Sequence, residues 1–247
     1  MIKIELIQFG DTYPVNYQKI ENFGNNSSIF KIINILENKN HEILNSEILR
    51  ISDENFKFLT NIKTDADFSV IIVNRPLDGN YFSRRISNKL IVISIFGIET
   101  LNIHEGISLE MYILRFLLAF TTIYNVYNGL PINANELMQK NPTGCLFDMC
   151  IYKPQISFFF RNPKLSSAVV NTLTSKTLPK NFLNNLKKEI KLLKIGNYYQ
   201  LTDWLKENPK KAIFFTFLIG LIFSELLGNY IYDLISKFLP FIETNCK

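Results

Sequence analysis

The sequence predicts an α/β soluble domain followed by a single C-terminal transmembrane helix. Two observations indicate this fold class. Short apolar runs rich in β-branched residues, typical of buried strands, alternate with segments of helical spacing over residues 1–196. A long apolar run then follows at residues 208–238. The 247 residues, of which 47% are hydrophobic and 20% charged, are enough to build one sizeable core.

Three segments have the composition of strands. The first, "MIKIELIQF" (1–9), alternates apolar and polar residues, as a half-buried strand does. The runs "DFSVIIVN" (67–74) and "KLIVISIFG" (89–97) are apolar and β-branched, which indicates buried strands. The sheet is therefore expected to contain at least three strands.

Helical segments are expected between and after these strands. Residues 10–27 are rich in Asn, Gly and Pro and are expected to form a loop. The following segment "SSIFKIINILEN" starts with an N-cap serine and has helical spacing. "ISLEMYILRFLLAFTTIYNVY" (107–127) lacks a basic flank and carries charges inside, so it is expected to be a core helix capped by Ser108. Two more helices are predicted, an amphipathic one within "LPKNFLNNLKKEIKLLKIG" (178–196) and a short one in "QLTDWLKEN".

The run at residues 208–238 has the length and boundaries of a membrane span. No charge occurs from Ala212 to Ser224, and about 20 apolar residues suffice to cross a bilayer. Asn208 is a suitable N-cap, Pro209 suits the first helical position, and Pro240 is expected to end the helix. The alternative is the last core helix of a soluble domain.

One side of this run carries small and polar residues. Small residues recur every four positions, which lets two membrane helices approach closely. A carboxylate and an amide lie beside them and would avoid lipid by facing a partner helix. The predicted helix interface therefore consists of Thr216, Gly220, Ser224, Glu225, Gly228 and Asn229.

The basic excess of the chain precedes the apolar run. Of the net charge of +5, residues 180–211 supply eight lysines against three acidic residues. This placement predicts an inner (cytoplasmic) membrane location with the N-terminal domain in the cytoplasm. The expected organisation is a cytosolic α/β domain (1–196), a basic juxtamembrane segment (197–207), a transmembrane helix (208–238) and a short tail (239–247).

The best candidate for ligand binding is the loop "NRPLDGNYFSRR" (74–85), which combines arginines with a glycine turn. Arginines on a loop at the end of a sheet suit a small anionic ligand such as a nucleotide. The predicted ligand-binding residues are Arg75, Asn80, Tyr81, Arg84 and Arg85. The alternative is a solvated loop whose arginines pair with nearby acids such as Asp78.

The cysteines support weaker hypotheses. Three cysteines, an odd number, are too few for a disulfide scaffold. Cys145 and Cys150 form a C-x4-C pair, which is half a metal site at best. Cys145 could alternatively act as a nucleophile with His104 as base and Asp148 as orienting acid. Structural cysteines remain the simplest interpretation.

The segment "CLFDMC", followed by Lys153 and Ile156, resembles a segment of uncharacterised bacterial proteins that also contain a later C-x2-C pair. The region that follows here, "SSAVVNTLTSK", has no cysteine. The resemblance implies that half of a set of zinc ligands is missing from this chain. It covers about thirty residues and implies no function.

The leading functional hypothesis is a membrane-anchored bacterial sensor or effector. Its cytosolic domain would bind a ligand or partner, and its C-terminal helix would self-associate in the membrane, as in membrane-acting anti-phage effectors. The expected partners are the lipid bilayer, a second copy of the chain and a small anionic ligand, and nucleic acid is not expected. No cofactor is expected and no catalytic residue is assigned, since no glycine-rich phosphate loop occurs. The alternative is a hydrolase-type enzyme, soluble or membrane-tethered, with a site around Cys145, His104 and the 74–85 loop.

Overall fold

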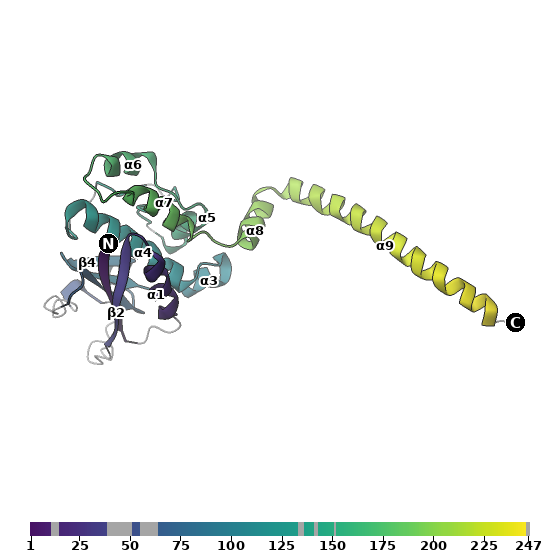
Figure 1. The fold of residues 1–247 in the computed structure, drawn as a ribbon, viewed down its shortest axis with the longest axis horizontal. Coiled ribbons are helices and arrows are strands. Elements are labelled where there is room, and N and C mark those ends of the chain that lie inside the picture. Colours follow the sequence, from purple (N-terminus) through teal and green to yellow (C-terminus); the bar gives the residue numbers. More distant parts are fainter. Residues whose placement is uncertain are drawn as a thin grey trace. The chain divides into compact units, whose positions relative to one another are not determined.

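The computed structural model describes residues 1–10, 15–38, 51–54, 64–132, 136–140, 143–150 and 152–245. The chain forms two compact units, Met1–Gly196 and Asn197–Lys247. The first unit contains the sheet and six α-helices among the described residues, and the second contains two helices (Figure 1).

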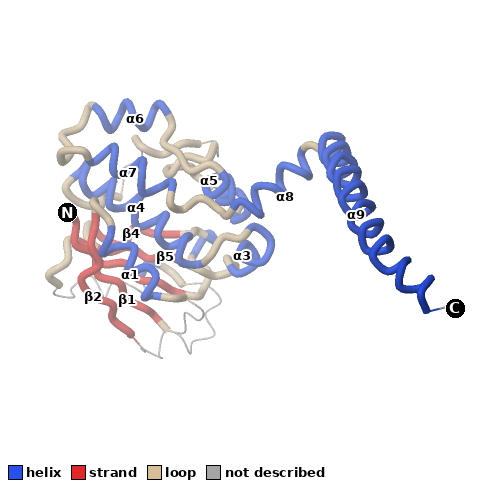
Figure 2. Tube along the Cα trace, turned by 45° about the vertical axis from the view of Figure 1, so that its right-hand side comes forward, coloured by secondary structure: helices blue, strands red, loops and turns tan. Residues whose placement is uncertain are grey.

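The first unit is built on a mixed sheet, which confirms the predicted α/β domain. Within the described residues the sheet has five strands in the order β2-β1-β3-β5-β4. Neighbouring strands pair in parallel, except that β4 runs antiparallel to β5. The strands form one layer (Figure 2) and are β1 (Ile2–Phe9), β2 (Phe30–Asn38), β3 (Phe68–Val73), β4 (Ser83–Ser87) and β5 (Leu90–Ser94).

The central strands have the sequences expected of strands covered on both faces. Every residue of β3 and of β5 is buried, and both strands consist mainly of Val, Ile and Leu. The outer strand β4 has the sequence "SRRIS", and all five of its residues are only half-buried. The composition of each strand thus follows its position in the sheet.

Helices pack on this sheet and on each other. The helices of the first unit are α1 (Tyr17–Asn26), α3 (Glu99–Glu105), α4 (Leu109–Tyr127), α5 (Ser157–Arg161), α6 (Ser167–Thr174) and α7 (Phe182–Lys191). In both views α4 lies between the sheet and the pair α6 and α7 (Figures 1 and 2). The second unit consists of α8 (Asn197–Glu207) and α9 (Pro209–Asn245).

Helix α4 is the predicted core helix. The hydroxyl oxygen of Ser108 accepts a hydrogen bond from the backbone N–H of Met111, which confirms the expected N-cap. On the sheet side, the Tyr112 hydroxyl donates to the carbonyl oxygen of Ser94 at 2.9 Å. The rings of Phe68 and Tyr124 lie 5.6 Å apart, so the helix is fixed to the sheet along its length.

Two local predictions are wrong. Residues 10–27, expected to be a loop, include helix α1, and "SSIFKIINILEN", expected to be a helix, forms strand β2. The isoleucines of this segment are β-branched and pair in parallel with the apolar strand β1, which outweighs the helical spacing. Helix α1 then approaches β2 closely at Gly24, where a Cβ would lie 3.1 Å from Ile32.

The predicted C-terminal transmembrane helix at 208–238 is contradicted. This segment is helical, as α9, and the helix continues past Pro240, where it was expected to end. Among the described residues, the helix long and apolar enough to cross a membrane is instead α4. Of its most apolar 18-residue stretch, 78% is buried inside the protein. Length and apolar composition are shared by core helices, so these two properties do not define a span.

Candidate functional site

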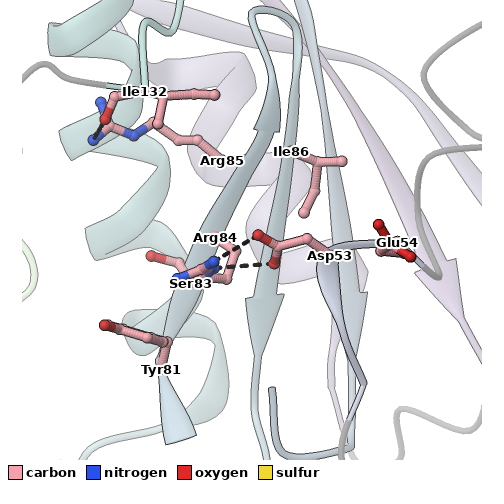
Figure 3. A pocket seen from close by; sticks show the side chains of 8 residues that line it. All are labelled: Asp53, Glu54, Tyr81, Ser83, Arg84, Arg85, Ile86 and Ile132. Carbon is pink, nitrogen blue, oxygen red and sulfur yellow. Dashed lines mark hydrogen bonds and ion pairs between the residues drawn. The ribbon is translucent and has the colours of Figure 1, made fainter. Parts of the chain in front are cut away.

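A cavity lies along β4, one of the two outer strands of the sheet within the described residues. It has a volume of about 700 Å³, within the usual range of ligand pockets. Four of its lining residues are consecutive in β4, so the cavity follows the strand (Figure 3). The lining consists of Asp53, Glu54, Tyr81, Ser83, Arg84, Arg85, Ile86 and Ile132.

Arg84 is held by a carboxylate inside this cavity. Its Nε and Nη2 donate to the two carboxylate oxygens of Asp53 at 3.0 and 2.6 Å, which is a bidentate pair. The guanidinium also lies 4.8 Å from the centre of the Tyr81 ring. Donation of these hydrogen bonds to Asp53 raises the pKa of Arg84. The charge of this arginine is therefore already neutralised by a neighbour.

Arg85 is held by backbone carbonyls instead. Its Nη1 donates to the carbonyl oxygen of Pro131, and its Nη2 donates to that of Ile132 at 2.7 Å. Burial lowers the pKa of this guanidinium. Figure 3 shows the Arg85 side chain directed to Ile132, away from the Arg84–Asp53 pair. The two arginines thus serve different parts of the cavity wall.

Backbone pairing places Asp53 beside β4. The N–H of Ile51 donates to the carbonyl oxygen of Pro76 at 3.0 Å, and the N–H of Asp78 donates to that of Ile51 at 3.0 Å. The side chains of Ile51 and Leu77 are buried in one apolar cluster with residues of β1, β3 and β5. This short pairing fixes residues 51–53 on the 76–78 turn, next to the strand that carries Arg84.

Three of the five predicted ligand-binding residues line this cavity: Tyr81, Arg84 and Arg85. Arg75 and Asn80 are not among its lining residues; the backbone carbonyl of Arg75 accepts from the Ser94 hydroxyl, and Asn80 is exposed with φ 55°. The sequence analysis did not predict Asp53, Glu54 and Ile132 as lining residues, because it placed residues 83–85 in a loop. The pairing of Ile51 with Leu77 and the contact of Arg85 with Ile132 join segments that are distant in the sequence. A role in ligand binding stays a prediction.

The proposed triad of Cys145, His104 and Asp148 receives no support from the described geometry. Cys145 is fully buried, and its sulfur accepts a hydrogen bond from the N–H of Ser166 at 3.4 Å. The side chain of His104 lies outside the described residues. A buried thiol of this kind is typical of structural cysteines.

Asp148 has a structural role in the same segment. Its Oδ2 accepts hydrogen bonds from the backbone N–H groups of Thr143, Gly144 and Cys145 at 2.6, 2.7 and 2.8 Å. The residue is only 7% exposed. One carboxylate oxygen therefore satisfies three neighbouring N–H groups and holds the loop closed, and the other accepts from the Thr143 hydroxyl at 3.4 Å.

The C-x4-C pair is divided between two environments. Cys150 is half-buried, and its thiol donates to the carbonyl oxygen of Asp148 at 3.8 Å, whereas Cys145 is fully buried. Burial raises the pKa of the Cys150 thiol. Within the described part of the chain, no group of three or more His, Cys, Asp or Glu residues is placed to hold a metal ion.

The small residues of α9 make contacts within their own helix. The hydroxyls of Thr216 and Ser224 donate to the carbonyl oxygens of Ala212 and Leu221. Nothing lies within 4 Å of a Cβ built at Gly220 or Gly228. The side chains of Glu225 and Asn229 lie outside the described residues. An interface through these residues stays a prediction.

Comparison with known proteins adds a distant structural similarity. No protein-family model matches the sequence, and no curated protein matches it. The fold is similar to that in the crystal structure of archaemetzincin (amzA) from Methanopyrus kandleri. The TM-score is 0.47 and the identity 14%, over 70% of this chain and 93% of that chain. At these values the similarity carries no argument about activity.

The hypothesis of a membrane-anchored sensor or anti-phage effector is contradicted. That hypothesis requires a C-terminal membrane span, whereas the membrane-length apolar helix among the described residues is the buried helix α4. We do not pursue that hypothesis. The hydrolase alternative is therefore judged from the residues of this chain, and the described residues around Cys145 do not form a catalytic group.

Proposed function

We propose that the first unit binds a peptide segment in an extended conformation along β4. The observation that carries this proposal is the position of the cavity, which follows four consecutive residues of an outer strand. An outer strand presents unpaired N–H and C=O groups, and an extended peptide can pair with them as an added strand.

The hydrogen-bond pattern indicates which backbone groups are available. The N–H of Ser94 donates to the carbonyl oxygen of Phe82 at 2.9 Å, so Phe82 faces β5. Residues of an antiparallel pair alternate between facing their partner strand and facing away from it. The backbone groups of Ser83 and Arg85 accordingly face the side of β4 opposite to β5, where an added strand would pair.

The charges in the cavity favour a peptide over a nucleotide. The cavity contains Arg84 and Arg85 but also Asp53 and Glu54, so neither sign of charge dominates. A phosphate would have to compete with Asp53 for Arg84 and with two carbonyl oxygens for Arg85. A peptide backbone needs both donors and acceptors, and it can bind without breaking these contacts.

The test uses the purified full chain and a library of short random peptides. Peptides that bind are recovered, and their affinities are measured by calorimetry for the wild type, Ser83→Pro and Ser83→Ala. Proline removes the outward N–H, and an outer strand tolerates it, whereas alanine keeps that group. We expect Ser83→Pro to weaken binding by about tenfold or more and Ser83→Ala to leave it unchanged.

Two results would overturn this proposal. One is that no peptide is enriched while a nucleotide such as ATP binds, which would favour the small anionic ligand. The other is equal binding by Ser83→Pro and Ser83→Ala. Mass spectrometry of the recovered peptides adds a test of the hydrolase alternative, since that activity would shorten them and binding alone would not.

A further inference from the structure

A second cavity lies where α1 and α7 meet, far in sequence from the β4 cavity. Its volume is about 340 Å³, which is at the lower end of the range for ligand pockets. It belongs entirely to the first unit. Its lining is formed by Lys19, Asn22, Phe23, Asn26, Ser27, Glu189 and Leu192.

Glu189 is a buried carboxylate in this cavity wall. The residue is only 7% exposed, and its Oε2 accepts from the Ser27 hydroxyl at 2.7 Å. Its Oε1 accepts from the backbone N–H of Ser28, also at 2.7 Å. Each carboxylate oxygen can accept a second hydrogen bond. Among the described residues, no cationic group pairs with this carboxylate, so its charge is hydrogen-bonded but not neutralised.

The rest of the cavity supplies apolar surface beside that charge. Phe23 lines the cavity, and its ring stacks on Phe30 with centroids 6.1 Å apart, which fixes its position. Leu192 lines the same cavity and is 70% exposed. Lys19 is exposed at the same cavity, so its ammonium group is solvated. An aromatic face next to an uncompensated carboxylate is suited to a cation with an apolar stem.

We propose that this cavity binds a small primary ammonium ion carried on a short apolar stem. The ammonium group would donate to the free lone pairs of Glu189, and the stem would lie between Phe23 and Leu192. An anion would be repelled by the buried carboxylate, and a neutral apolar molecule would leave it without a counter-ion. This inference does not depend on peptide binding at β4.

The first test compares two probes of the same shape on the full chain. The probes are n-butylammonium and 1-butanol, and binding is followed by saturation-transfer NMR. We expect the ammonium ion to bind about tenfold or more tightly than the alcohol, and we expect Glu189→Gln to remove that difference. Equal affinities for the two probes in the wild type, or no binding of either, would overturn the proposal.

A second pair of variants decides the question if Glu189→Gln fails to fold. Leu192 follows Glu189 by three residues at the end of α7, so a side chain at this position can reach the carboxylate. Leu192→Lys places a tethered ammonium group in the cavity and should abolish n-butylammonium binding, whereas Leu192→Gln should retain it. Because Leu192 is exposed, both variants should fold. Unchanged binding by Leu192→Lys would also contradict the proposal.

Discussion

Asp148 and Glu189 are equally buried carboxylates with different surroundings. Each residue is 7% exposed. Asp148 accepts three backbone N–H bonds on one oxygen and closes a loop around itself. Glu189 accepts one bond on each oxygen and lines a cavity of about 340 Å³. Burial of a charge alone therefore does not single out a candidate binding site, and the proposal for Glu189 depends on the open space beside its carboxylate.

Removal of the Asp148 carboxylate should have the largest effect on stability. In Asp148→Ala, the N–H groups of Thr143, Gly144 and Cys145 lose their shared acceptor, and Gly144 and Cys145 are buried. Unsatisfied buried groups cost about 1–3 kcal/mol each, so we expect a loss of about 3–5 kcal/mol in the free energy of unfolding. Urea denaturation of the full chain measures it. A loss below about 1 kcal/mol would show that the loop does not depend on this carboxylate.

The same loop should be sensitive to a single added methyl group. Gly144 has φ 89°, and a Cβ there would lie 2.9 Å from the carbonyl oxygens of Phe158 and Asn162. Gly144→Ala therefore strains the backbone in two ways, and we expect a loss of about 2 kcal/mol. Gly196→Ala is the matched control, because nothing lies within 4 Å of its Cβ position. A similar loss in both variants would mean that the loop has no special geometry.

The strands of the sheet differ in how far the sequence could predict them. Strands β1, β3 and β5 were predicted because apolar, β-branched runs indicate buried strands without knowledge of their partners. Strand β4 was not, because "SRRIS" has the composition of a polar loop and becomes a strand only by pairing with β5. The α/β class thus followed from the central strands, and the outer strand that carries the candidate site did not.

Glu189 was missed for a related reason. It occurs in a lysine-rich amphipathic helix, where a glutamate is normally solvated. Its partners are Ser27 and Ser28, more than 160 residues earlier in the chain. Those serines were themselves assigned to the start of a helix, whereas the Ser27 hydroxyl accepts from the N–H groups of Ile29 and Phe30 at the start of β2. Only the folded chain brings the two segments together.

The pH dependence of stability should distinguish Glu189 by its sign. Burial raises the pKa of this carboxyl group, although the Ser27 and Ser28 hydrogen bonds oppose the shift. A carboxyl whose pKa is raised on folding stabilises the protein below its unfolded-state pKa, and this contribution is lost as the pH rises through the folded-state value. We therefore expect wild type to lose stability relative to Glu189→Gln as the pH rises above about 4, the usual pKa of a glutamate.

The measurement is urea denaturation of both proteins across this pH range. Lys19 is the other charged residue lining the cavity, but it is not among the groups that shift the pKa of Glu189, so it does not change the expected sign. Glu136 provides a control in which stability should depend on pH in the opposite direction, since its hydrogen bond with Lys176 lowers its pKa. Wild type should lose stability relative to Glu136→Gln as the pH falls. A constant difference between wild type and Glu189→Gln would contradict the expected effect of burial.

Asp53 is a third carboxylate, and it should show the smallest effect on stability. Its ion pair with Arg84 is bidentate, but the two side chains remain 38% and 35% exposed, so solvent screens the interaction. We expect Asp53→Asn to cost about 0.5 kcal/mol, measured by urea denaturation, and the cost to shrink at high salt. Peptide affinity should change little, since the outward backbone groups of β4 remain. A large stability loss that salt does not reduce would show that the pair supports the cavity wall as Asp148 supports its loop.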